Sequence, residues 1–93
     1  MINVVKRDGE VAEFNLSKIS DAITKAFHAT NKSYTDEIIN LLALRVTSNF
    51  QEKVKDNTVT VEDIQDSVEH VLEHTGYTDV AKAYILYRKN REK

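Results

Sequence analysis

The sequence predicts an α+β fold in which a small sheet, an antiparallel hairpin or three strands, caps one end of a four-helix bundle. Three observations lead to this prediction: a strong hairpin signal near the N-terminus, four segments with helical spacing of apolar residues, and a length of 93 residues. A chain of this length is enough for one hydrophobic core and too short for two. We therefore expect residues 1–93 to form a single domain.

Residues 2–14 predict the hairpin. Residues 2–6 are short and β-branched, which favours a strand, and residues 11–14 form the return strand. Asp8-Gly9 between them is a strong turn signal, because Gly adopts a positive φ at no steric cost. Two strands alone are marginally stable in water, so the hairpin must pack against the helices that follow.

The next two segments predict amphipathic helices. The first begins near Asn15 or Ser17, which are both good N-cap residues. The second begins at Thr35, has two acidic residues at the positive end of its dipole, and continues toward Val54. Apolar residues recur on each at steps of three and four: Leu16, Ile19, Ile23, Ala26 and Phe27, then Ile38, Ile39, Leu42, Ala43, Val46 and Phe50.

Residues after the second helix predict a third strand and a third helix. Thr58 and Val59 are candidates for a short strand beside the hairpin. Thr60 is then an N-cap, with Asp63 three residues on as a short version of the capping box. Gly76 ends this helix as the residue after the C-cap, and its apolar face consists of Ile64, Val68, Val71 and Leu72.

The last helix begins at Thr78-Asp79. It ends in the basic run of residues 87–93, which is favourable at the negative end of a helix dipole. Its inward face is expected to consist of Val80, Ala81, Tyr84 and Ile85.

Composition excludes several classes of protein. The net charge of −2 and isoelectric point of about 5.9 argue against nucleic acid as a partner. The absence of cysteine excludes disulfides, zinc–thiolate sites and thiol catalysis by this chain. No apolar stretch approaches the roughly 20 residues of a membrane span, and no signal peptide fits the first residues. We expect a cytoplasmic protein with no membrane partner, in which any anion site is local.

Lys6 and Arg7 are the candidate for such a local site. Two adjacent cations are most often a solvated pair, because exposed charge is the norm. Neighbouring strand residues point to opposite faces, so both can reach one phosphate only where the strand ends, as it does at Asp8-Gly9. Lys18 and the N–H groups at the start of the first helix could join them. The residues thus indicate a nucleotide-phosphate site, although neither GxxxxGK[ST] nor GxGxxG is present.

The segment "VVKRDGEVAEFNLSKISDAITKAF" resembles the opening of an ATP-cone domain. The segment "DVAKAYILYRKNRE" is similar to the last helix of that family, so the resemblance covers nearly the whole chain. The combination of N-terminal motifs is fairly specific, whereas its four-residue core alone would be weak. The matching positions are Val4-Val5, Lys6-Arg7-Asp8-Gly9, Phe14, Asn15 and Lys18-Ile19.

The resemblance implies an allosteric domain that binds ATP or dATP, with Mg²⁺ as a candidate companion. Such domains stand at the N-terminus of ribonucleotide reductase large subunits, and this chain looks most like the anaerobic class. ATP then keeps the enzyme active, and dATP switches it off by changing how subunits assemble. The implied partners are adenine nucleotides and either the catalytic domain of a reductase or a second copy of the chain. The chain itself is expected to be no enzyme and to carry no catalytic residue.

The resemblance also implies roles for individual residues. Lys6 and Arg7 match the pair that binds the triphosphate, and Val5 lies on the strand that borders the base. Asn15 and Lys18 match polar positions near the sugar and phosphates. Three further positions are implied contacts: Thr60 near the base or sugar, with an ambiguity of one residue, Lys82 near the phosphates, and Tyr87 from the last helix.

One position departs from the family pattern. Many members have Glu where this chain has Ala12. Glu13 is adjacent but is expected on the other face of the strand. The departure puts in doubt a carboxylate contact to the nucleotide.

Other interpretations remain open at this stage. The chain could be a helical interaction module without a nucleotide ligand, or the cone of a transcriptional repressor, although that repressor carries a cysteine zinc ribbon that is absent here. His70 and His74 have the spacing of metal ligands, but a solvated helix face is preferred and no metal is predicted. His28 and Asp66 are expected on the surface. Asp63 is expected to cap the third helix, and Tyr84 is expected in the core.

Overall fold

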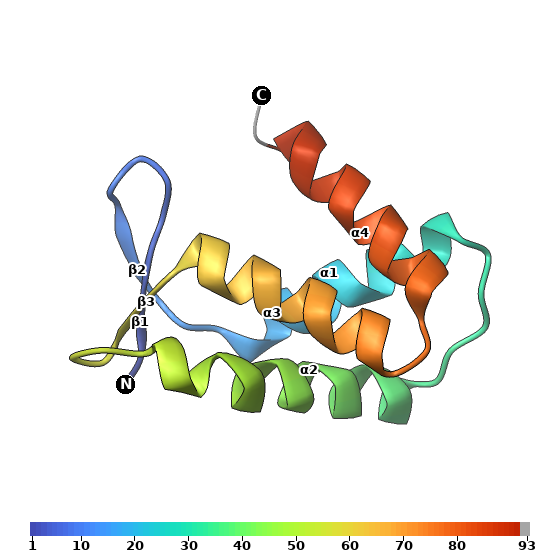
Figure 1. The fold of residues 1–93 in the computed structure, drawn as a ribbon, viewed down its shortest axis with the longest axis horizontal. Coiled ribbons are helices and arrows are strands. Elements are labelled where there is room, and N and C mark those ends of the chain that lie inside the picture. The colour runs from blue at the N-terminus through green and yellow to red at the C-terminus, as the bar shows by residue number, and fades with distance from the viewer. Residues whose placement is uncertain (92–93) are drawn as a thin grey trace.

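The computed structural model describes residues 1–91 and confirms the α+β fold (Figure 1). Four helices form the body of the molecule, and a three-stranded sheet lies at one end of them. The last two residues of the predicted basic run lie outside the described residues. The elements are β1 (Asn3–Val5), β2 (Val11–Glu13), α1 (Leu16–Ala29), α2 (Asp36–Phe50), a short 3₁₀ helix η1 (Gln51–Lys53), β3 (Thr58–Thr60), α3 (Val61–His74) and α4 (Thr78–Arg91).

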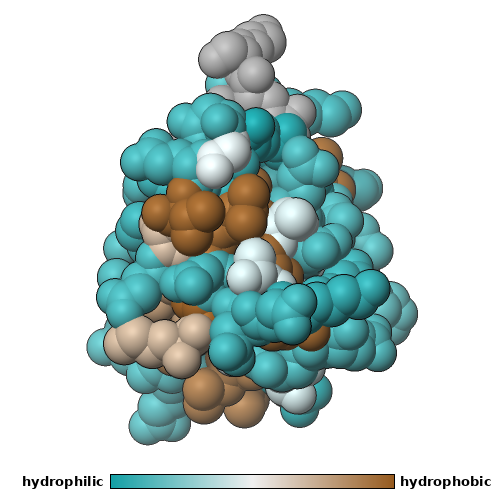
Figure 2. Space-filling view, turned by 90° about the vertical axis from the view of Figure 1, so that its left-hand side faces the viewer, coloured by the Kyte–Doolittle hydropathy of each residue, from teal (hydrophilic) through white to brown (hydrophobic). Residues whose placement is uncertain are grey.

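The sheet is mixed, with strand order β2-β1-β3. The central strand β1 pairs antiparallel with β2 and parallel with β3, so that Val4 lies between Ala12 and Val59. The third strand is confirmed at Thr58 and Val59, and the structure shows in addition that it runs parallel to β1. Figure 2 looks at the sheet side of the molecule and shows hydrophobic residues surrounded by hydrophilic ones.

The turn between β1 and β2 has the expected chemistry. Gly9 adopts φ +86°, which is accessible to glycine at no steric cost. The N–H of Lys6 donates to the carbonyl of Glu10 at 2.7 Å, and the N–H of Gly9 donates to the carbonyl of Lys6 at 2.9 Å. The N–H of Glu10 also donates to the carboxylate of Asp8 at 2.9 Å. These bonds fix Lys6 at the point where β1 ends and the turn begins.

The predicted N-caps are confirmed at three helices. The side chain of Asn15 accepts from the N–H of Ser17 at 3.0 Å, which settles the choice between these two residues. The hydroxyls of Thr35 and Thr60 accept from backbone N–H groups at the starts of α2 and α3. Gly76, with φ +89°, follows the C-cap of α3 as predicted. The α-helical part of α2 ends at Phe50, earlier than predicted, because the chain tightens into η1.

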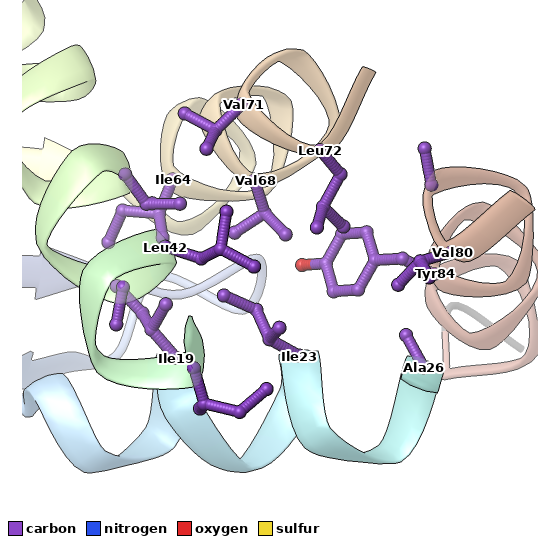
Figure 3. Packing of buried hydrophobic residues seen from close by; sticks show 14 of the residues in the cluster. Ile19, Ile23, Ala26, Leu42, Ile64, Val68, Val71, Leu72, Val80 and Tyr84 are labelled. Carbon is purple, nitrogen blue, oxygen red and sulfur yellow. The ribbon is translucent and has the colours of Figure 1, made fainter. Parts of the chain in front are cut away.

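The core draws on all four helices and on β3. Phe14, which follows β2, forms an edge-to-face pair with Phe50 at a centroid distance of 5.4 Å and so attaches the hairpin to α2. Tyr84 is buried as predicted, and Figure 3 shows its hydroxyl pointing from α4 toward Val68, Leu72 and Ile23. Burial raises the pKa of the Tyr84 hydroxyl well above its ordinary value.

Asp66 is exposed as predicted, but its carboxylate also has a partner. Arg88 of α4 donates to its carboxylate at 2.9 Å and also contacts Glu69, which lies one turn further along α3. No local sequence pattern indicates this pairing, because the partners are 22 and 19 positions apart on different helices. Arg88 thereby ties α4 to α3. Among residues 1–91, no helix is both long and apolar enough to cross a lipid bilayer.

The cap of α2 gives a test of the fold. Thr35→Ala removes the oxygen that accepts from the N–H of Ile38, which should lower the free energy of unfolding by about 0.5–2 kcal/mol. Urea unfolding followed by far-ultraviolet circular dichroism measures the loss. Thr35→Ser keeps the acceptor and should remain close to wild type. Equal stability of the alanine variant and wild type would show that the cap contributes nothing.

Candidate functional site

A cleft of about 410 Å³ lies between the hairpin, α1, α3 and α4. In Figure 1 the hairpin and the C-terminal part of α4 stand on either side of the region above α1 and α3. The volume falls within the roughly 300–1,000 Å³ that is usual for small-molecule sites. Because four elements contribute to it, the cleft exists only in the folded chain.

One wall of the cleft is apolar and partly aromatic. Val4 contributes from the central strand, Ile64 and Val68 from α3, and Tyr84 and Tyr87 from α4. Tyr87 is half-buried, whereas Tyr84 is almost fully covered and belongs to the core. This wall can take a flat apolar group such as an aromatic base.

The cleft also has polar lining residues, among them three lysines. Lys6 comes from the end of β1, and Lys18 and Lys25 come from α1, where they lie two turns apart on one face. The ammonium of Lys25 also lies over the ring of Tyr87, at 5.8 Å from its centroid. All three lysines are exposed, so each keeps its charge available to an anion that enters the cleft.

Two carboxylates accompany the lysines in this lining. They belong to Glu13 at the end of β2 and Asp21 on α1. Ala12 also borders the cleft, and its short side chain brings no charge to it. Strand alternation predicts that Glu13 lies on the opposite face of β2 from Ala12. Glu13 nevertheless lines the cleft together with Ala12.

Arg7 lies beside this cleft rather than in its lining. Its guanidinium donates through Nη2 to the side-chain oxygen of Gln65 at 3.0 Å, and Nη1 lies 3.4 Å from a carboxylate oxygen of Glu62. Both partners are on α3, and Gln65 itself lines the cleft. The two adjacent cations of the hairpin are therefore divided: Lys6 borders the cleft, and Arg7 spans from the hairpin to α3.

The structure brings together half of the residues that the sequence proposed. Lys6, Asn15, Lys18 and Tyr87 line the cleft. Four others do not line it: Val5, Arg7, Thr60 and Lys82.

Backbone geometry explains two of these absences. Neighbours on a strand face opposite ways, and Val4 lines the cleft in place of Val5. Val61 lines it in place of Thr60, within the one-residue ambiguity of the prediction, while the Thr60 hydroxyl is used as the cap of α3. Lys82 is exposed on α4 but lies outside the lining.

Sequence reasoning missed several residues of the cleft, among them the polar residues Asp21, Lys25 and Gln65. Lys25 carries a usable signal, because it stands seven residues after Lys18 on an amphipathic helix. Gln65 carries none, because only the folded chain brings α3 against the hairpin.

A second, smaller cavity of about 290 Å³ lies between α2 and α3. Arg45 borders it together with His70 and His74, whose rings stack at 3.9 Å. Within residues 1–91, no cluster of three or more histidine, cysteine or acidic side chains is placed to hold a metal ion. His28 is exposed as predicted, but its ring nitrogen also pairs with the hydroxyl of Tyr34 at 2.7 Å.

Comparison with known proteins identifies the family to which the chain belongs. Residues 2–93 match the family described as the ATP cone domain. The chain belongs to the ATP-cone family. An ATP cone is an allosteric nucleotide-binding domain, so this chain is a regulatory rather than a catalytic domain, as the sequence predicted.

The similar proteins are ribonucleotide reductases of several kinds. The cone is 42% identical over 97 residues to ribonucleoside-diphosphate reductase subunit alpha of Chlamydia pneumoniae. The aligned region covers 98% of this chain and 9% of that protein. It is 43% identical to a vitamin B12-dependent ribonucleoside-diphosphate reductase of Thermoplasma acidophilum, over 95% of this chain and 12% of that protein.

An anaerobic ribonucleoside-triphosphate reductase of Haemophilus influenzae is 37% identical, over 96% of this chain and 12% of that protein. The cone therefore spans about a tenth of the length of these relatives. Several reductase classes share this cone, so the match does not single out the anaerobic class.

Proposed function

We propose that this ATP cone binds ATP and dATP in the cleft between the hairpin, α1, α3 and α4, and that the two nucleotides regulate a ribonucleotide reductase in opposite directions. ATP activates the enzyme and dATP inhibits it. The observation that carries the proposal is the pairing of an apolar aromatic wall with three lysines in one cleft. A base and a polyphosphate need these two kinds of surface side by side.

The triphosphate is assigned to the end of the cleft near the hairpin turn. Lys6 leaves β1 at that end, and Lys18 lies in the first turns of α1. The positive end of the α1 dipole, capped by Asn15, lies in the same region and favours an anion. Arg7 is close enough in the chain to add a planar bidentate donor when its side chain turns toward the phosphates.

The adenine is assigned to the apolar wall formed by α3 and α4. Tyr87 offers a half-buried ring, and Ile64 and Val68 offer aliphatic surface. Val5 and Thr60 remain proposed contacts through their backbone and hydroxyl, because each is adjacent in sequence to a residue of the lining. Lys82 remains a proposed phosphate contact from the exposed side of α4.

Mg²⁺ is a proposed companion of the triphosphate. Glu13 and Asp21 would repel free phosphate oxygens, but carboxylates are the ligands that Mg²⁺ accepts beside a nucleotide. The ion would neutralise part of the triphosphate charge next to these two acids. Binding measured with and without Mg²⁺ tests this assignment.

Discrimination between ATP and dATP depends on one hydroxyl group. A site that hydrogen-bonds the 2′-hydroxyl prefers ATP, because an unpaired buried polar partner costs about 1–3 kcal/mol. Affinity alone switches nothing, and the two nucleotides must also stabilise different arrangements of the cone and its partner. The proposed partner is the catalytic domain of a reductase or a second copy of the cone.

A second candidate function is a helical interaction module that binds no nucleotide. The observation in its favour is the pair Leu41 and Leu44, which lie exposed three residues apart on α2. Thermal unfolding with ATP separates the two functions. A ligand at 100 times its dissociation constant adds about 2.7 kcal/mol of stability, whereas an interaction module gains nothing.

Lys6→Ala tests the phosphate end of the site. The substitution removes one charged donor and should weaken ATP binding about 10- to 100-fold without changing the fold, because Lys6 is exposed. Isothermal titration calorimetry with ATP, dATP and GTP measures the affinities, and circular dichroism checks the fold. A variant that unfolds would show that Lys6 is structural, and unchanged affinity would remove it from the site.

Lys25→Ala tests a cleft residue that the sequence alone did not predict. It should weaken ATP binding about 3- to 30-fold, the range expected for one exposed charge near a polyphosphate. Lys32→Ala is a matched control, because Lys32 also lies over a tyrosine ring, at 5.6 Å from Tyr77, but outside the cleft. Equal effects of the two substitutions would contradict a specific role for Lys25.

A further inference from the structure

Two arginines bind the same side of α3, one from each flank of the cleft. Arg7 of the hairpin contacts Glu62 and Gln65, and Arg88 of α4 contacts Asp66 and Glu69. The four α3 residues stand at positions i, i+3, i+4 and i+7, so they form one stripe along the helix. The hairpin and α4 are thus both attached to α3 through this stripe.

The two attachments differ in exposure. The side chain of Arg88 is 17% exposed, whereas the side chains of Arg7 and Glu62 are 40% and 56% exposed. Arg7 lies 3.4 Å from Glu62, at the long end of an ion pair, and exposed pairs of this kind contribute little stability. The Arg7–Glu62 contact is therefore the one that a ligand can break.

A nucleotide in the proposed site offers Arg7 a better partner. Lys6, its neighbour in the chain, and Gln65, its hydrogen-bond acceptor, both line the cleft. A triphosphate there brings several charged oxygens to the end of the cleft where the hairpin turns. Arginine binds a phosphate through two parallel hydrogen bonds, which are shorter and stronger than a single contact at 3.4 Å.

We propose that Glu62 competes with the phosphates of the nucleotide for Arg7, so that the Arg7–Glu62 pair is an autoinhibitory contact that nucleotide binding opens. This inference rests on the proposed function. Gln65 is neutral and can keep its hydrogen bond to Arg7 or release it, so it positions the guanidinium without repelling phosphate. Opening the pair leaves the Glu62 carboxylate without this partner at the start of the α3 stripe. Because Glu62 is exposed, nucleotide binding in the cleft then changes the charged groups that the outer surface of α3 presents.

Glu62→Gln is the direct test, because it removes the charge and keeps the size of the side chain. Isothermal titration calorimetry should show ATP binding about 2- to 5-fold tighter than in wild type, the range expected from losing an exposed pair. Glu73→Gln is the matched control: it makes the same change of charge on an exposed residue three turns further along the same face of α3, beyond the four residues of the stripe and outside the cleft lining. It should leave the affinity unchanged.

A double-mutant cycle with Arg7→Ala separates competition from a general effect of charge. If Glu62 acts through Arg7, the gain from Glu62→Gln disappears when Arg7 is already alanine. A gain that persists in the Arg7→Ala background, or no gain over wild type, would overturn the inference while leaving ATP binding itself intact. Failure of the wild-type cone to bind ATP would instead refute the proposed function and this inference with it.

Discussion

The pairing of β1 with strands on both sides is the constraint on which the rest of the structure depends. β2 holds it on one side through a tight turn, and β3 holds it on the other by a parallel register. β3 continues without a break into α3, so the same three residues that complete the sheet also set where α3 begins. The hairpin turn and the first turns of α3 are therefore neighbours, although Arg7 and Gln65 are 58 positions apart.

This arrangement lets a chain with a net charge of −2 present a local cationic site. The lysines of the cleft come from the end of β1 and from α1, and they outnumber its two carboxylates. The apolar wall comes from α3 and α4, and further acidic residues lie elsewhere, including the α3 stripe. Tyr84 and Arg88 attach α4 to the bundle through the core and through the stripe respectively. The hairpin contacts α3 through Arg7 and α4 contacts it through Arg88, so a ligand that touches the hairpin and α4 together can also act on α3.

Local chemistry explains how much the sequence could predict. The caps at Asn15, Thr35 and Thr60 and the turn at Gly9 involve bonds within a few residues, and short-range rules find such bonds. Helical spacing predicts most of the core positions for the same reason, although Leu16 is exposed and Ile85 is only partly buried. The parallel direction of β3, the contact of Arg7 with α3 and the pairing of Asp66 with Arg88 depend on how distant segments dock, which no local pattern encodes. Strand alternation explains why Val4 lines the cleft in place of Val5.

The location of the bound nucleotide is the central claim, and amide chemical shifts measured by nuclear magnetic resonance test it most directly. Titration of the ¹⁵N-labelled cone with ATP should shift amide signals in the hairpin turn, the first half of α1, the start of α3 and the second half of α4. Signals of α2 around Arg45 and of α3 around His70 should stay in place, because they border the other cavity. Shifts confined to that second cavity, or none at saturating ATP, would contradict the account.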